Sequence, residues 1–142
     1  MKIYPTTGID AIRLGMRRIQ SQEVLGRPTL IEKESQDEQW QYHQGLELLF
    51  QKEDLYLLGK ITITNIAAQL DSKPVIGLNE QELLNNFPYL ALEEDFEDNG
   101  KNYVCSEREL SVWVSDGIVS NVTLFPAYDK TGEIPVWPSP NP

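Results

Sequence analysis

The stretch L-S-V-W-V-S-D-G-I-V-S-N-V-T-L-F, residues 110–125, consists of two alternating apolar runs joined by Ser115-Asp116-Gly117. This pattern predicts a β-hairpin whose three-residue loop places Gly117 in the left-handed conformation. The expected register pairs Val114 with Ile118, Val112 with Ser120 and Leu110 with Val122.

The two faces of this hairpin differ in polarity. The face that we expect in the core carries Leu110, Val112, Val114, Ile118, Val122 and Leu124. The other face carries Ser111, Trp113, Val119, Asn121, Thr123 and Phe125. This second face is too polar for another full core and too aromatic for an ordinary solvated surface.

The chain has 142 residues, of which 40% are hydrophobic and 24% charged. These values are typical of a globular protein, and the length suits a single domain. We therefore expect one folding unit spanning residues 1–142.

The formal net charge is -10, from 22 acidic and 12 basic residues. A negative field repels nucleic-acid phosphates and anionic lipid headgroups, so we expect neither direct nucleic-acid binding nor membrane binding. Two explanations of the acidity stay open: it serves solubility, or it complements a basic partner.

Cysteine use and the chain start predict a cytoplasmic location. Cys105 is the only cysteine, so no intramolecular disulfide can form, in keeping with a reducing compartment. The first ten residues contain no apolar run of signal-peptide length, and no stretch is long enough to span a bilayer.

The two halves of the chain share an order of features. L-G-M at residues 14–16 and I-G-L at residues 76–78 each precede a predicted helix, with an offset of 62 positions from residue 14 to residue 76. A polar connection and a three-stranded antiparallel meander follow each helix. This order predicts an α+β fold of two tandem helix-plus-antiparallel-meander units, about 12–63 and 74–125, although a chance match of alternating strands stays open.

Other local signals mark the ends of these units. Asn79 is the predicted cap of the second helix, and Glu82 stands at the capping-box position. A proline-rich arm, residues 126–142, is expected to lie extended on the body of the protein, because its last part contains four prolines.

The reactive inventory is small. The glycines form no phosphate-binding motif. A Cys–His nucleophilic pair would need Cys105 and His43 to meet, and a buried thiol and an edge imidazole are the plainer interpretation. We therefore predict no catalytic residue, no metal, no cofactor and no enzymatic activity.

An acidic run, E-E-D-F-E-D at residues 93–98, stands in a predicted loop. Its five carboxylates belong to Glu93, Glu94, Asp95, Glu97 and Asp98. Catalysis needs carboxylates from different elements in a shielded cleft, and a calcium loop needs alternating ligands, so neither function is favoured. The run is either a solvated loop or a ligand for the Arg and Lys side chains of a partner.

Aromatic residues supply a second binding signal. Trp113 and Phe125 on the polar face of the hairpin, with Tyr128 just beyond it, are of the type that anchors protein interfaces. The competing interpretation is that the proline-rich arm folds back and Trp137 covers Trp113.

Three segments resemble the small immunity proteins encoded beside bacterial polymorphic and contact-dependent toxins: I-G-L-N-E-Q-E-L-L-N-N-F-P (76–88), N-Y-V-C (102–105) and residues 109–125. The motifs I-R-L-G-M (12–16) and L-G-R-P (25–28) look like the opening of BamE-like and β-lactamase-inhibitor-like units, in which a helical part precedes a meander. BamE lipoproteins carry an export signal and a lipidated cysteine near the start, and neither is present here.

This resemblance implies an immunity protein that neutralises a cognate toxin, commonly a nuclease, by occluding its active or substrate-binding surface. The acidity independently favours such a partner, because a nuclease needs a basic surface to hold nucleic acid. Two alternatives stay open: a non-catalytic scaffold or chaperone-like binding domain, and a small hydrolase that uses carboxylates.

Overall fold

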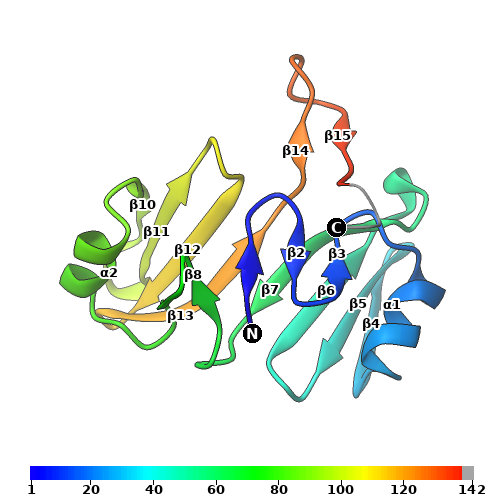
Figure 1. The fold of residues 1–142 in the computed structure, drawn as a ribbon, viewed down its shortest axis with the longest axis horizontal. Helices are drawn as coiled ribbons and strands as arrows, with labels where there is room; N and C mark the ends of the chain where they lie inside the picture. Colours follow the sequence, from blue (N-terminus) through cyan, green and yellow to red (C-terminus); the bar gives the residue numbers. More distant parts are fainter. Residues whose placement is uncertain (139–142) are drawn as a thin grey trace.

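The computed structural model describes residues 1–138, and its centre is an eight-stranded antiparallel sheet (Figure 1). The strands are β4 (Leu30–Glu34), β5 (Asp37–Tyr42), β6 (Leu46–Phe50), β7 (Leu58–Ile63), β10 (Ala91–Asp95), β11 (Lys101–Cys105), β12 (Leu110–Ser115) and β13 (Ile118–Leu124). They lie in the order β10-β11-β12-β13-β7-β6-β5-β4. The mixed α and β content that the sequence predicts is confirmed, although strands dominate.

The remaining elements are short. The α-helices of the described residues are α1 (Arg18–Leu25) and α2 (Glu80–Asn86), and the 3-10 helices are η1 (Lys52–Asp54) and η2 (Glu97–Asn99). The small sheets consist of β1 (Ile3–Tyr4), β2 (Gly8–Ile9) and β3 (Ile12–Arg13), of β8 (Gln69–Leu70) with β9 (Lys73–Pro74), and of β14 (Ala127–Tyr128) with β15 (Pro135–Val136). No helix in the part of the chain that the structure describes is long and apolar enough to cross a membrane.

The large sheet consists of two four-stranded meanders, β4–β7 after α1 and β10–β13 after α2. They join through β7 and β13, where Thr62 lies opposite Thr123. The sequence predicted three strands in each half and missed β4 and β10. All five residues of each of these edge strands are exposed, so neither strand has the apolar alternation that marks a half-buried strand.

The L-G-M and I-G-L segments make matching contacts. The Gly15 N–H donates to the Leu58 carbonyl at 2.8 Å, and the Leu58 N–H donates to the Met16 carbonyl at 2.8 Å. In the other half, the Gly77 N–H donates to the Val119 carbonyl at 2.9 Å, and the Val119 N–H donates to the Leu78 carbonyl at 2.8 Å. Each segment is thereby fixed to the start of the last strand of its own meander.

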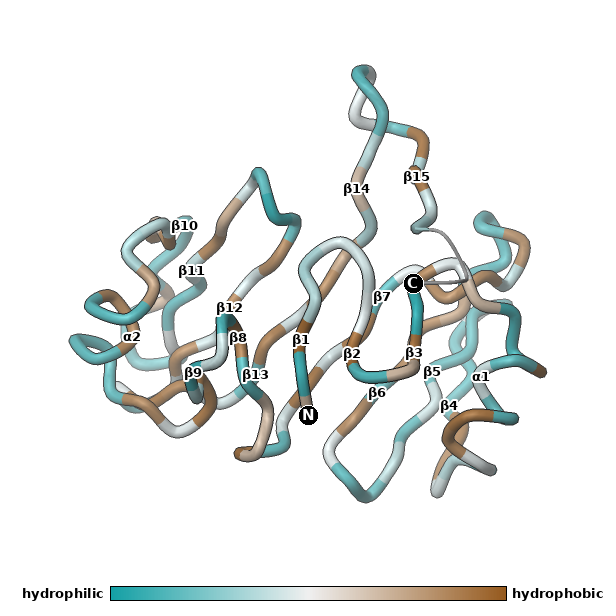
Figure 2. Tube along the Cα trace, viewed as in Figure 1, coloured by the Kyte–Doolittle hydropathy of each residue, from teal (hydrophilic) through white to brown (hydrophobic). Residues whose placement is uncertain are grey.

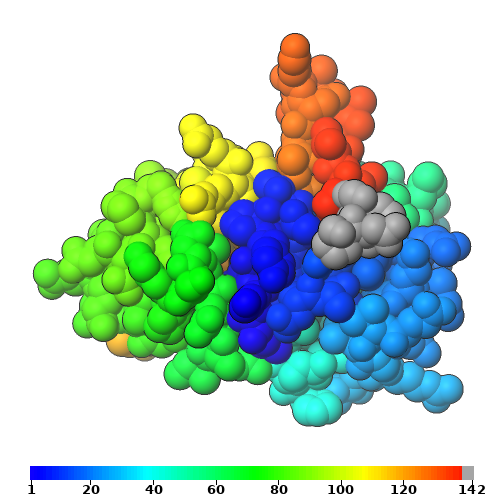
Figure 3. All heavy atoms as spheres, viewed as in Figure 1, coloured from blue at the N-terminus to red at the C-terminus, as the bar shows by residue number. Residues whose placement is uncertain are grey.

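One face of the large sheet is covered. Both helices and the small sheets β1–β3 and β8–β9 lie over it, and the N-terminal residues fill the middle of this side (Figures 1 and 3). Hydrophobic residues recur along the strands beneath (Figure 2). The N-terminal segment contributes Ile3, Ile9, Ile12 and Leu14 to this core, although the sequence predicted no structural role for residues 1–11. We call this side the covered face.

The central hairpin forms with a different register from the expected one. Its loop has two residues, Asp116 and Gly117, with φ of 51° and 75°, and Ser115 lies opposite Ile118. A two-residue turn of this kind matches the twist of the flanking strands. A bulge at Ser120 then shifts the register by one residue, so that Val112 faces Val122.

The shorter loop and the bulge together explain which face assignments were wrong. Val119, expected on the polar face, is buried with 1% of its surface exposed, and Ile118, expected in the core, is 45% exposed. Beyond the bulge the alternation returns to the expected faces, and Leu110, Val112, Val114, Val122 and Leu124 are all buried as predicted.

The C-terminal arm is not simply extended. Ala127 and Tyr128 pair with Val136 and Pro135 to form a hairpin that projects from the body (Figure 1). Trp137 then lies against Gly15, where an added Cβ would be 3.0 Å from the Trp137 Cβ. The expectation that Trp137 covers Trp113 is therefore wrong. The last part of the predicted arm, residues 139–142, lies outside the described residues.

Candidate functional site

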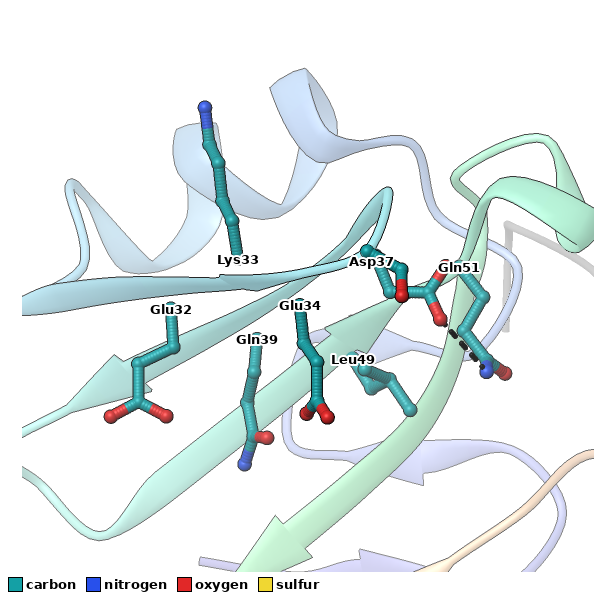
Figure 4. A pocket seen from close by; sticks show the side chains of 8 residues that line it. Glu32, Lys33, Glu34, Asp37, Gln39, Leu49 and Gln51 are labelled. Atoms are coloured by element: carbon teal, nitrogen blue, oxygen red, sulfur yellow. Dashed lines mark hydrogen bonds between the residues drawn. The ribbon is translucent and has the colours of Figure 1, made fainter.

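The opposite face of the large sheet carries neither helix, and we call it the open face. Figure 4 shows Glu32, Glu34 and Gln39 pointing away from α1, while Lys33 points toward it. The side chains that alternate with the core residues along the inner strands belong to this face. They are Gln41, Glu47, Leu49, Lys60, Thr62, Asn102, Val104, Ser111, Trp113, Asn121 and Thr123.

Four hollows adjoin one another on the open face. The first, of about 700 Å³, lies over β4–β6 and shares Leu49 and Gln51 with a second, of about 400 Å³, beside the β14–β15 hairpin. Phe125 lines both this hollow and a third, of about 400 Å³. The third shares Glu93, Asn102 and Ser111 with the last, of about 440 Å³. Because neighbouring hollows share walls, they form a trough across the sheet.

The trough is strongly acidic. Its walls contain two lysines, Lys33 and Lys60, and nine carboxylates: Glu32, Glu34, Asp37, Glu53, Asp54, Glu93, Glu94, Glu109 and Glu133. Burial, and then the charges of Glu53 and Asp37, raise the pKa of the Asp54 carboxyl. The raised pKa therefore reflects partial burial first and the neighbouring negative charges second, and a cation placed beside Asp54 would oppose both effects.

The sequence-predicted acidic residues divide into two groups. Glu93 and Glu94 line the trough, and the Glu93 carboxylate accepts a hydrogen bond from the Asn102 amide at 3.0 Å. Asp95 instead accepts from the backbone N–H of Glu97 at 2.8 Å, at the start of η2. Glu97 and Asp98 lie in η2, outside these four hollows.

The predicted loop is therefore only partly a loop. Glu93, Glu94 and Asp95 belong to the edge strand β10, whose exposure on both sides lets charged residues occupy a strand without burial.

Trp113, Phe125 and Tyr128 all line the trough, although they come from different elements. Trp113 packs against Phe96, with ring centroids 5.6 Å apart and ring planes inclined by 46°. Gly100 lies under the same indole, where an added Cβ would be 2.7 Å from Cζ2. Sequence reasoning missed Phe96, whose position among five carboxylates was its only signal.

The candidate nucleophile pair is not assembled. His43 follows β5 and Cys105 ends β11, and at about 4.8 Å per strand the five intervening steps separate them by about 24 Å. The imidazole Nδ1 lies 3.3 Å from the Thr29 hydroxyl, and the Cys105 thiol is buried. Over residues 1–138, no three His, Cys, Asp or Glu side chains are grouped so as to hold a metal ion.

The ion pairs of the described residues lie away from the trough. Arg18 pairs with Glu38 at 2.7 Å, Lys101 with Glu80 at 3.0 Å and Arg108 with Asp71 at 3.1 Å. Glu80 also accepts a hydrogen bond from the Tyr103 hydroxyl, which is the main cause of its lowered pKa. Burial and this bond raise the pKa of Tyr103 to about 12. These contacts attach α1, α2 and the β8–β9 segment to the covered face, so we assign them a structural role.

No family model and no curated protein sequence matches this chain. Among solved structures, a DUF4309 family protein from Bacillus subtilis is similar in fold, with 9% identity and a TM-score of 0.58 over 86% of this chain and 88% of that one. An extracellular protein containing an SCP domain from Bacillus anthracis has 11% identity and a TM-score of 0.53 over 83% of this chain. This chain covers 45% of that protein's length. At such identities the similarity shows the fold alone.

Proposed function

We propose that this protein is an immunity protein that binds a cognate toxin, a basic nuclease domain, and occludes its active or substrate-binding surface. One observation carries the proposal: nine carboxylates and three aromatic interface candidates line a single trough on the face that the helices leave open. The resemblance to immunity proteins supports the same function, with the two helix-plus-meander halves taken as tandem units of one domain.

The charge of the trough suits this partner physically. A nuclease holds its substrate through Arg and Lys side chains that contact phosphates, and carboxylates can accept hydrogen bonds from the same side chains. The trough has nine carboxylates against two lysines, so the attraction extends across the whole sheet rather than resting on one ion pair. Such a field accelerates capture of an oppositely charged protein.

The aromatic residues supply the part of an interface that charge does not. Trp113 and Phe125 are half-buried and Tyr128 is 37% exposed, so each is held by the fold and still reachable from the open face. Residues of this type, placed among polar neighbours, are those that slow dissociation. In this proposal the carboxylates govern association and the aromatic rings govern dissociation.

The experiment is to co-express the protein with the toxic domain encoded beside its gene, and to measure cell survival and the two rate constants of the purified complex. Protection and tight binding, with no activity of this protein alone, would support the proposal. A neighbouring toxin that is neither bound nor neutralised would refute it.

Two charge reversals with equal effects on net charge show whether the trough is used. Glu32→Lys lies in the trough, whereas Glu23→Lys lies exposed on α1. We expect Glu32→Lys to slow association several-fold in dilute buffer and Glu23→Lys to do so much less. The difference should vanish at 1 M salt, where the Debye length is about 3 Å.

The salt dependence of the association rate also distinguishes the immunity function from the main alternative. A scaffold or chaperone-like domain would recognise its partner chiefly through the aromatic residues, and its association rate would change little with ionic strength. Turnover of any substrate by the purified protein would instead favour the hydrolase.

A further inference from the structure

The large sheet ends in two edge strands of equal length, β4 and β10, and they differ in regularity. β10 pairs with β11 through a bulge between Leu92 and Glu94, and it leads directly into η2. β4 pairs with β5 without a shift in register, from Leu30 to Glu34. Because a bulge interrupts strand pairing, β4 offers the more regular edge to another strand.

The turn between β4 and β5 determines which backbone groups of β4 point away from the sheet. Glu34 lies opposite Asp37, so the connection is a two-residue loop and this pair is hydrogen-bonded. Hydrogen-bonded and non-hydrogen-bonded pairs alternate along an antiparallel ladder, so Lys33 and Ile31 direct their N–H and C=O groups away from β5. No hydrogen bond among the described residues occupies these outward groups.

We propose that β4 accepts an extended segment of a basic partner protein as a ninth strand, with Arg or Lys at alternate positions of that segment. The outward groups of Ile31 and Lys33 would supply the main-chain hydrogen bonds of such strand addition. Glu32 and Glu34 point to the open face beside the 700 Å³ hollow, where they would stand across from the basic side chains. Opposite charges on neighbouring strands stabilise the pairing.

The side chains of β4 also disfavour the simplest competitor, a second copy of this chain. Antiparallel self-pairing centred on the strand places Glu32 opposite Glu32, and a shift by one pair places Lys33 opposite Lys33. The opposite shift places Ile31 opposite Ile31 and Glu32 opposite Leu30, and it is the one register of the three without a like-charged pair. Like charges directly opposite are destabilising, so two of these three registers are unfavourable for self-pairing, whereas a basic strand meets Glu32 and Glu34 with the opposite charge.

The test uses a capped peptide of about nine residues, longer than the five-residue edge, with arginine at every second position and threonine or valine between. A control peptide has the same composition with its arginines grouped. Binding is measured to the wild-type protein and to Lys33→Pro and Lys33→Ala. Both variants lose the lysine charge, but only the proline variant loses the backbone N–H at this position.

We expect the alternating peptide to bind better than the grouped one and to slow amide hydrogen exchange at Ile31 and Lys33. Lys33→Pro should weaken binding about tenfold, the effect of losing one or two hydrogen bonds, while Lys33→Ala should keep it. Equal binding of the two peptides, equal binding by the two variants, or protection at β10 rather than β4 would overturn the proposal. The exchange measurement on the wild type stands even if Lys33→Pro fails to fold.

The basic character of the partner strand rests on the proposed function, but different results would refute strand addition and the immunity function. A neighbouring toxin that binds the wild type, Lys33→Pro and Lys33→Ala equally would refute strand addition and leave the immunity function standing. An alternating peptide that protects β4, in a protein that neutralises no toxin, would refute immunity and leave strand addition standing.

Discussion

The two faces of the large sheet share the same strands but have different compositions. Along β12, Val112 points to the covered face and has no exposed surface, while its neighbour Ser111 lines the trough on the open face. The covered face is apolar because helices and small sheets exclude water from it. The open face keeps carboxylates and half-buried aromatic rings because no helix covers it and its side chains remain in contact with water. The difference shows that one face is closed by the fold, whereas the other stays accessible.

The largest expected effect comes from comparing two variants that place an aspartate at adjacent positions of β12, one on each face of the sheet. Val112→Asp places an unpaired carboxylate where no surface is exposed, which costs several kcal/mol of a total stability of about 5–15 kcal/mol. We expect this variant to unfold at room temperature, as circular dichroism can show. Ser111→Asp should melt close to the wild type. Equal destabilisation by both variants would mean that the open face is buried as well.

A second pair compares the faces in the other half of the sheet. Leu48 is fully buried and Leu49 lies on the open face, next to it in β6. Leu48→Ala should lower the free energy of unfolding by about 2–5 kcal/mol, whereas Leu49→Ala should cost less than about 1 kcal/mol. Urea denaturation measures both. A cost at Leu49 that approaches that at Leu48 would contradict the assignment of this face to binding.

Substitution of Trp113 tests whether a side chain of the open face serves packing or binding. If its indole anchors a partner, Trp113→Ala should raise the dissociation rate by the equivalent of about 2 kcal/mol. Because the ring also packs on Phe96, we expect some loss of melting temperature in addition. Phe96→Ala is the control, since it removes this contact and keeps the indole. A toxin complex that dissociates at the wild-type rate in Trp113→Ala would restrict that residue to packing.

The smallest expected effect concerns the covered face at low pH. The Tyr103 hydroxyl and Lys101 lower the pKa of Glu80 below its usual 4.5. Their contribution to stability is therefore present above pH 4.5 and is lost as the pH falls through the lowered pKa. Tyr103→Phe should cost about 0.5–1 kcal/mol at pH 7 after solvent screening.

Melting curves at pH 7 and pH 3 give the measurement, because the difference between Tyr103→Phe and the wild type should shrink at the lower pH. Ser111→Ala, which changes a hydroxyl on the open face, is the control, and its difference from the wild type should not depend on pH. A constant deficit of Tyr103→Phe across this range would mean that the hydrogen bond to Glu80 contributes nothing.

Features that depend on near neighbours along the chain were predictable from the amino-acid sequence. Alternation in β12 and β13 identified buried positions such as Val112 and Leu124, because side chains of a strand point to opposite faces in turn. The capping box of α2 was also predictable: the Asn79 side chain accepts from the Glu82 N–H at 2.8 Å, and the Asn79 N–H donates to the Glu82 carboxylate at 3.1 Å. Both signals span only a few residues.

The residues of the candidate site are brought to one face by long-range strand pairing, which local patterns do not reveal. The trough extends from Glu32 on one edge of the sheet, past Glu133 of the last hairpin, to Glu93 on the other edge, and this order depends on the pairing of β7 with β13. The bulge at Ser120 and the edge strands β4 and β10 likewise depend on which strands become neighbours. Local alternation identifies the buried side of a strand, but strand order alone determines where the sheet ends and what stays uncovered.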